Sequence, residues 1–162
     1  MKTLIIIVAI LSTGLMAGIF FTWTNAVKPG IGTLDDMTYM KAFQAMNRLI
    51  LNPLFYIVFI LPVLTISIST YMSFGSTKLY VFELFLLSTL LYVLGVFLIT
   101  ILGNIPLNEL LENTDLEKIS LTELSDLRGK IENKWNNFNL IRTVSSFISF
   151  LLLVICLFFI KN

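Results

Sequence analysis

Residues 121–160 read LTELSDLRGKIENKWNNFNLIRTVSSFISFLLLVICLFFI, and this stretch determines the fold that we expect. Its first half is polar, with apolar residues three and four apart, whereas residues 140–160 carry a single charge, Arg142. The pattern predicts one helix from about Leu121 to Ile160. Forty residues at ~1.5 Å each reach ~60 Å. Because the hydrocarbon core of a bilayer is ~30 Å thick, about half of this helix should project from a membrane.

Three more segments are long and apolar enough to cross a bilayer, at about 3–23, 53–72 and 79–102. Only the last of them holds a charge, Glu83. A signal peptide is the alternative reading of the first segment, since Lys2 precedes it and Ser12-Thr13-Gly14 resembles a cleavage site. The apolar run that resumes at Leu15 argues against that alternative.

The sequence therefore predicts an all-α integral membrane protein, an up-down bundle of four transmembrane helices. Residues 1–162 are expected to form a single transmembrane domain. Its spans are about 3–23, 53–72, 79–102 and 140–160, and helical segments at about 35–51 and 106–139 lie in two long connections on one side.

The composition supports this class and excludes others. Hydrophobic residues make up 57% of the chain and charged residues 13%, against roughly 25% charged in a typical soluble domain. One cysteine excludes a disulfide scaffold, and a net charge of +1 gives no field that attracts nucleic acid. The chain has no histidine, so the commonest metal ligand and the usual general base are missing. We find no nucleotide, zinc or redox motif and expect no cofactor and no metal.

Charge distribution predicts the orientation. Both termini should lie on one side with Lys2, Lys78 and Lys161, opposite the two long connections. Those connections hold seven basic residues: Lys28, Lys41, Arg48, Lys118, Arg128, Lys130 and Lys134. The positive-inside rule then places the long connections in the cytoplasm, and we expect a bacterial inner (plasma) membrane.

Local signals mark turns and helix starts in the long connections. Residues 28–32, KPGIG, are expected to form a turn, and Pro106 is expected to break or kink the third helix, with Asn104 capping its continuation. Asn52 before Pro53 predicts an N-cap. Ser120 and Glu123 match a capping box.

Polar and aromatic residues gather at the ends of spans, on the side of the long connections. They form three groups: Trp23 with Asn25; Asn47, Arg48 and Asn52; and Asn104 and Asn108 with Trp135, Asn139 and Arg142. The last three are spaced to share one helix face. Unpaired amides and guanidinium groups at membrane depth are costly, so we expect these side chains to meet, either as a structural network or as a site.

At these residues the sequence resembles the anthrone oxygenase-like family of small four-span membrane proteins, over nearly the whole chain. The resemblance rests on AGIFFTW at 17–23, KPG at 28–30, MNRLILNPLF at 46–55, GNIPLN at 103–108, and Trp135, Asn139, Arg142, Thr143 and Ser146. Most bacterial members of that family have no assigned function. Fungal members are similar to enzymes that oxidise polyketide anthrones to anthraquinones with O2.

The resemblance implies a cofactor-independent oxidation of an aromatic polyketide or quinol-like substrate. On this hypothesis Arg142 and Arg48 hold a substrate oxyanion, and Asn104, Asn108 and Asn139 orient substrate or O2. Trp23 and Trp135 would stack on the planar rings, with Asn47 and Asn52 also binding substrate.

Two alternatives remain open from the sequence. The chain could bind or transport a lipophilic small molecule or lipid without chemistry, or it could be a structural membrane subunit whose projecting helix contacts a partner. The expected partners are membrane lipid, an aromatic or lipophilic small molecule and O2, with no nucleic acid, and the sequence leaves a homo-oligomer open.

Overall fold

The computed structural model describes residues 2–75 and 78–161, whose regular elements are all helices. The first long helix consists of α1 (Lys2–Thr22), a π-helical turn η1 (Trp23–Val27) and α2 (Lys28–Gly32). Next come α3 (Asp36–Ile50) and α4 (Pro53–Ser73). The third long helix comprises α5 (Leu79–Tyr92), η2 (Val93–Leu98), η3 (Thr100–Asn104) and α6 (Ile105–Glu112), and α7 (Leu121–Lys161) is the last.

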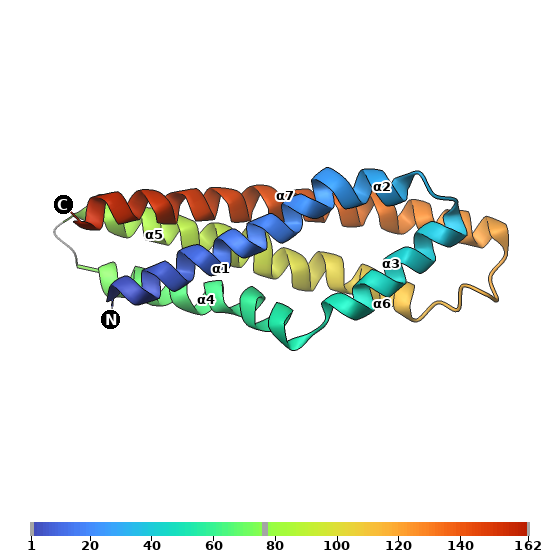
Figure 1. Cartoon of the computed structure of the whole chain (residues 1–162), viewed down its shortest axis with the longest axis horizontal. Coiled ribbons are helices and arrows are strands. Elements are labelled where there is room, and N and C mark those ends of the chain that lie inside the picture. The colour runs from blue at the N-terminus through green and yellow to red at the C-terminus, as the bar shows by residue number, and fades with distance from the viewer. Residues whose placement is uncertain (1, 76–77, 162) are drawn as a thin grey trace.

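Four of these helical stretches are long and apolar enough to cross a membrane: Lys2–Gly32, Pro53–Ser73, Leu79–Glu112 and Leu121–Ile160. α1 packs against α4 and α7, and α5 packs against the same two helices. Figure 1 shows the four running side by side, with α2, α3, α6 and the first half of α7 forming one end. The expectation of an all-helical membrane bundle with extra helices at one end is confirmed.

Two expectations were wrong, the turn at residues 28–32 and the cap by Asn104, because a π-helical turn precedes both Pro29 and Pro106 and the helix continues through each. Residues 28–32 are helical, and Asn104 has helical angles (φ −77°, ψ −42°) and makes no side-chain cap. Proline cannot donate the backbone hydrogen bond to the residue four positions back. At Pro106 the helix instead adopts five-residue spacing, in which the N–H of Ile105 donates to the carbonyl of Thr100.

The expected helix starts are confirmed. The side chain of Asn52 accepts from the N–H of Phe55 at 3.0 Å and begins α4. Ser120 and Glu123 bond reciprocally at the start of α7, with Glu123 N–H donating to Ser120 Oγ at 3.3 Å. Asp35 caps α3 by accepting from Thr38 N–H, and the side chain and the N–H of Thr38 together lower the pKa of the Asp35 carboxyl.

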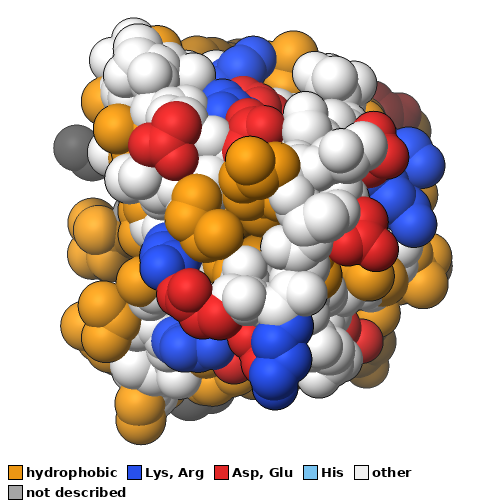
Figure 2. Space-filling view, turned by 90° about the vertical axis from the view of Figure 1, so that its right-hand side faces the viewer, with side chains coloured by type: hydrophobic (Ala, Val, Ile, Leu, Met, Phe, Trp, Pro, Cys, Tyr) orange, Lys and Arg blue, Asp and Glu red, His pale blue; other side chains and the backbone are white. Residues whose placement is uncertain are grey.

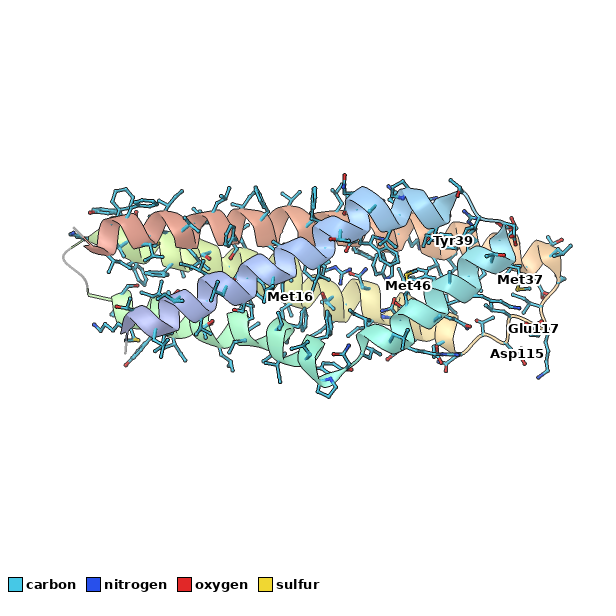
Figure 3. The ribbon with its side chains drawn as sticks, in the orientation of Figure 1. Met16, Met37, Tyr39, Met46, Asp115 and Glu117 are labelled. Atoms are coloured by element: carbon cyan, nitrogen blue, oxygen red, sulfur yellow. The ribbon has the colours of Figure 1, made fainter. Side chains whose placement is uncertain are left out.

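Two clusters of buried side chains lie along the molecule. One lies among the spans, and Met16 belongs to it. The other lies at the projecting end between α3, α6 and α7, and Tyr39 belongs to it (Figure 3). Glycine lets α7 approach the third helix between the two clusters, since a Cβ at Gly103 would lie 2.8 Å from Cδ2 of Phe138. This close approach brings the polar face of α7 against η3.

Candidate functional site

Three aromatic rings from three elements meet where the spans end and the projecting helices begin. Trp23 in η1 lies 4.4 Å from Trp135 in α7, centroid to centroid, and Phe43 in α3 lies 5.1 Å from Trp135. Both indole N–H groups have partners: Trp23 Nε1 donates to Asn136 Oδ1 at 2.9 Å, and Trp135 Nε1 donates to Asn108 Oδ1 at 2.7 Å. We call Trp23, Phe43 and Trp135 the aromatic cluster.

Arg142 lies next to this cluster and is only 5% exposed. Its Nη1 donates to Thr100 Oγ1 at 3.3 Å and its Nη2 donates to Asn139 Oδ1 at 2.9 Å. The guanidinium carbon is 4.5 Å from the ring centroid of Phe20 and 5.1 Å from that of Trp135. Such cation–π contacts stabilise a buried cation in part.

No ion pair among residues 2–75 and 78–161 includes Arg142. The charge is therefore held by neutral hydrogen-bond acceptors and aromatic faces alone. Because buried charges are nearly always paired, this guanidinium is suited to bind an anionic group of a ligand.

Asn139 positions the guanidinium. Its Nδ2 donates to the carbonyl of Phe20 at 3.1 Å and to Thr24 Oγ1 at 2.9 Å, while its Oδ1 accepts from Arg142. One amide thus joins the end of the first span to α7 and orients Arg142.

Within residues 2–75 and 78–161, three buried side-chain atoms have no hydrogen-bond partner: Arg142 Nε, Asn104 Oδ1 and Asn47 Nδ2. Asn104 is 1% exposed, and its Nδ2 donates to the backbone carbonyl of Trp135 at 3.3 Å. Buried polar atoms without partners are rare in proteins. Arg142 and Asn104, which both adjoin Trp135, thus keep hydrogen-bonding capacity that a ligand could use.

Most of the predicted site residues come together, but two do not. Trp23, Asn108 and Trp135 bond within the aromatic region, and Asn104, Asn139 and Arg142 adjoin it. Arg48 instead lies on the surface and pairs with Glu112 at 2.8 Å, and Asn52 is an exposed cap. Arg48 follows Asn47 directly in α3, and consecutive side chains of a helix point about 100° apart. Arg48 therefore faces the surface although Asn47 is partly buried.

Asn25, grouped with Trp23 in the sequence, is exposed. Glu83 is also exposed. It lies in the first turns of α5, more than four helical turns before η3. Neither contributes to the Arg142 region.

The prediction from sequence omits five residues that build the site: Phe20, Thr24, Phe43, Thr100 and Asn136. One signal could have found Thr100, because it precedes Asn104 by four residues and so shares its helix face. Thr24 and Thr100 also lie in the π-helical turns η1 and η3. Such turns occur often at functional sites.

An apolar groove of about 350 Å³ lies on the outer surface between the third long helix and α7, and neither Thr100 nor Arg142 lines it. Its lining includes Gly95, Ile99 and Ile141, and the last two are the chain neighbours of Thr100 and Arg142. A second cleft of about 360 Å³ lies at the opposite end of the spans, near Lys2 and Ser73. Among the described residues, no group of three or more His, Cys, Asp or Glu side chains could hold a metal ion.

Comparison with known proteins bears on this region. A family model described as anthrone oxygenase matches residues 52–152, a stretch that includes Thr100, Asn104, Trp135, Asn139 and Arg142. Comparisons with curated proteins and with solved structures find no match. Because the matched stretch covers more than half of the chain, this protein belongs to the anthrone oxygenase family.

Proposed function

We propose that the protein is a membrane-embedded oxygenase that oxidises an anthrone-like or quinol-like aromatic compound with O2 and without a cofactor. The observation that carries this proposal is the buried Arg142, which has no carboxylate partner and lies between aromatic rings. A planar phenolate or enolate offers what these groups lack, a negative oxygen on a flat apolar body.

Substrate recognition would follow from the unsatisfied groups. The oxyanion accepts from Arg142 Nε, and a hydroxyl or water donates to Asn104 Oδ1. The ring system packs on the aromatic cluster, where offset or edge contacts between rings are favourable. Asn139 keeps the guanidinium in place.

The proposed reaction balances without a further oxidant. An anthrone gives one methylene proton to solvent and becomes an enolate, whose carbon forms a bond to O2. A proton from solvent completes a hydroperoxide. Loss of water then breaks the O–O bond and the remaining C–H bond and forms the second carbonyl. One O2 is consumed, one water is released, and four electrons pass from the substrate carbon to oxygen.

The protein's contribution is electrostatic. A fixed cation in a site of low dielectric stabilises the enolate and the charge that develops on oxygen, without reorganising. The same cation lowers the pKa of an enol or phenol that binds beside it. Ionisation of an acidic substrate therefore needs no histidine or carboxylate at the site.

The setting of the reaction is the membrane. We propose that the substrate enters from the bilayer, where an apolar groove lies between the third long helix and α7. We also propose a bacterial inner membrane, with α2, α3 and α6 on the cytoplasmic side, where the basic residues of the long connections favour that orientation.

The test measures O2 uptake by the purified protein in detergent with anthrone, against the uncatalysed rate. We expect uptake above that rate and its loss by about 100-fold or more in Arg142→Met, the effect of removing a group that stabilises an oxyanion. Lys134→Met is the matched control, because it removes a positive charge from an exposed position of α7. Uptake that never exceeds the uncatalysed rate contradicts the proposal and favours a binding or transport protein.

A further inference from the structure

The surroundings of Arg142 do not neutralise its charge in the absence of substrate. Thr100 and Asn139 offer neutral oxygens, Phe20 and Trp135 offer ring faces, and Nε has no partner at 5% exposure. A cation so deeply buried is disfavoured unless an anion joins it. We infer that the resting protein binds a monovalent inorganic anion, such as a halide, at Arg142.

The free donor indicates where the anion lies. Nη1 and Nη2 of Arg142 each donate one hydrogen bond, to Thr100 and Asn139, whereas Nε is the one nitrogen of this guanidinium without any partner in the described structure, so its edge is the favoured place for the anion. Asn47 Nδ2 is a second unpartnered buried donor, on the turn of α3 that follows Phe43. Phe43 packs against Trp135, so this face of α3 is turned toward the site. Asn104 Oδ1 is an acceptor and gives an anion no stabilisation.

An anion on this edge would occupy the place of the substrate oxyanion. Inorganic anions should therefore inhibit oxidation in competition with the substrate. This consequence rests on the proposed function, whereas binding of the anion itself does not.

The two tryptophans of the chain provide a direct readout. Trp135 lies 5.1 Å from the Arg142 guanidinium carbon, and Trp23 lies 4.4 Å from Trp135. Since the sequence has two tryptophans in all, its indole fluorescence reports on this region. Iodide quenches indole emission on contact, so iodide bound at Arg142 would quench both rings.

The experiment titrates the purified protein with iodide at constant ionic strength, with gluconate as the balancing anion. We expect quenching that saturates, and that chloride reverses, in the wild-type protein and in Lys134→Met. In Arg142→Met the saturating component should disappear, leaving only quenching that rises linearly with iodide. Arg142→Lys keeps a cation and should keep saturation, with affinity weakened by about tenfold through loss of the Nε donor.

Neutral acrylamide is the control for ring accessibility and should quench all variants alike. A linear response to iodide in the wild type, or saturation that persists in Arg142→Met, would overturn the inference. Both results are independent of O2 uptake. Saturable quenching without oxidation would contradict the proposed function alone, and oxidation without saturable quenching would contradict the anion site alone.

Discussion

Arg128 and Arg142 lie on the same helix, about 21 Å apart along its axis, in opposite surroundings. Arg128 Nε donates to Glu132 at 2.8 Å, Nη1 donates to Asp36 at 3.0 Å and to the carbonyl of Leu34 at 2.8 Å, and Nη2 donates to the carbonyl of Gly32 at 3.0 Å. Arg142 has two neutral acceptors and an unpartnered Nε. Arg128 is thus fully paired within the fold, whereas Arg142 is left able to bind a ligand.

The two arginines also differ in how they meet aromatic rings. Arg128 lies 4.3 Å from the ring of Tyr39, and burial raises the pKa of that phenol, so Tyr39 stays neutral. Figure 2 shows acidic and basic side chains side by side on the projecting end of the molecule. At its tip, Glu117, labelled with Asp115 in Figure 3, pairs with Lys41. The carboxylates that form ion pairs thus lie at the projecting end. Arg142, which is buried next to the spans, makes no ion pair with a described carboxylate.

The largest expected effect separates activity from stability at Arg142. Arg142→Met should lower O2 uptake by about 100-fold or more, while the free energy of unfolding changes by less than about 1 kcal/mol, because removal of a buried charge without a carboxylate partner offsets the loss of the hydrogen bonds to Thr100 and Asn139. Anthrone-dependent O2 uptake and thermal unfolding of the same preparation measure the two quantities. Unfolding of the variant at room temperature would show that Arg142 is chiefly structural.

Arg128→Met should have the reverse effect. It leaves Asp36, Glu132 and two backbone carbonyls without their donor, so we expect the free energy of unfolding to fall by about 2 kcal/mol or more. O2 uptake per folded molecule should stay within about threefold, since the ring of Tyr39 and not a ligand lies over this guanidinium. Equal stability of variant and parent would remove the contrast between the two arginines.

A smaller effect is expected at Asn104, whose Oδ1 has no partner in the fold. Asn104→Leu should raise the KM for a hydroxylated substrate by about tenfold, the cost of one lost hydrogen bond to a buried acceptor. Asn113→Leu is a suitable comparison, because Asn113 is exposed at the end of α6. A KM that is unchanged in both variants would exclude Asn104 from substrate binding.

The smallest effect is expected at Arg48, the arginine on the surface. Arg48 is 60% exposed in its pair with Glu112, and exposed pairs contribute roughly 0–1 kcal/mol. Arg48→Met should change the free energy of unfolding by less than about 0.5 kcal/mol and O2 uptake by less than about twofold. A loss of activity comparable to that of Arg142→Met would restore the role that the sequence suggested for Arg48.

Much of the fold could be predicted from local patterns. The four apolar segments, the long helix through 121–160 and the caps at Asn52 and Ser120 depend on residues within a few positions of one another. The same reasoning failed for the turn at residues 28–32 and for the cap by Asn104. A proline removes one hydrogen bond, but whether the helix stops there or continues after a π-helical turn, as it does at η1 and η3, is not written in the local sequence.

The candidate site could be predicted in part. Trp135, Asn139 and Arg142 follow from helix spacing on one element, and Asn104 and Asn108 from theirs. Arg48 was placed with Asn47 by closeness in the chain, although neighbouring residues of a helix face different directions. Thr100 could have been found from its place four residues before Asn104, but nothing local marks Phe20 and Thr24 as neighbours of an arginine.

Composition and periodicity alone determined that this chain forms long apolar helices, because burying about 20 residues in hydrocarbon requires every backbone group to bond within its own helix. Which side chains share a site was decided by tertiary structure alone. The close approach of α7 at Gly103 and the widened turns η1 and η3 rotate polar residues from separate helices toward Arg142. Such contacts depend on the angles and distances between helices, which the order of residues within one helix does not specify.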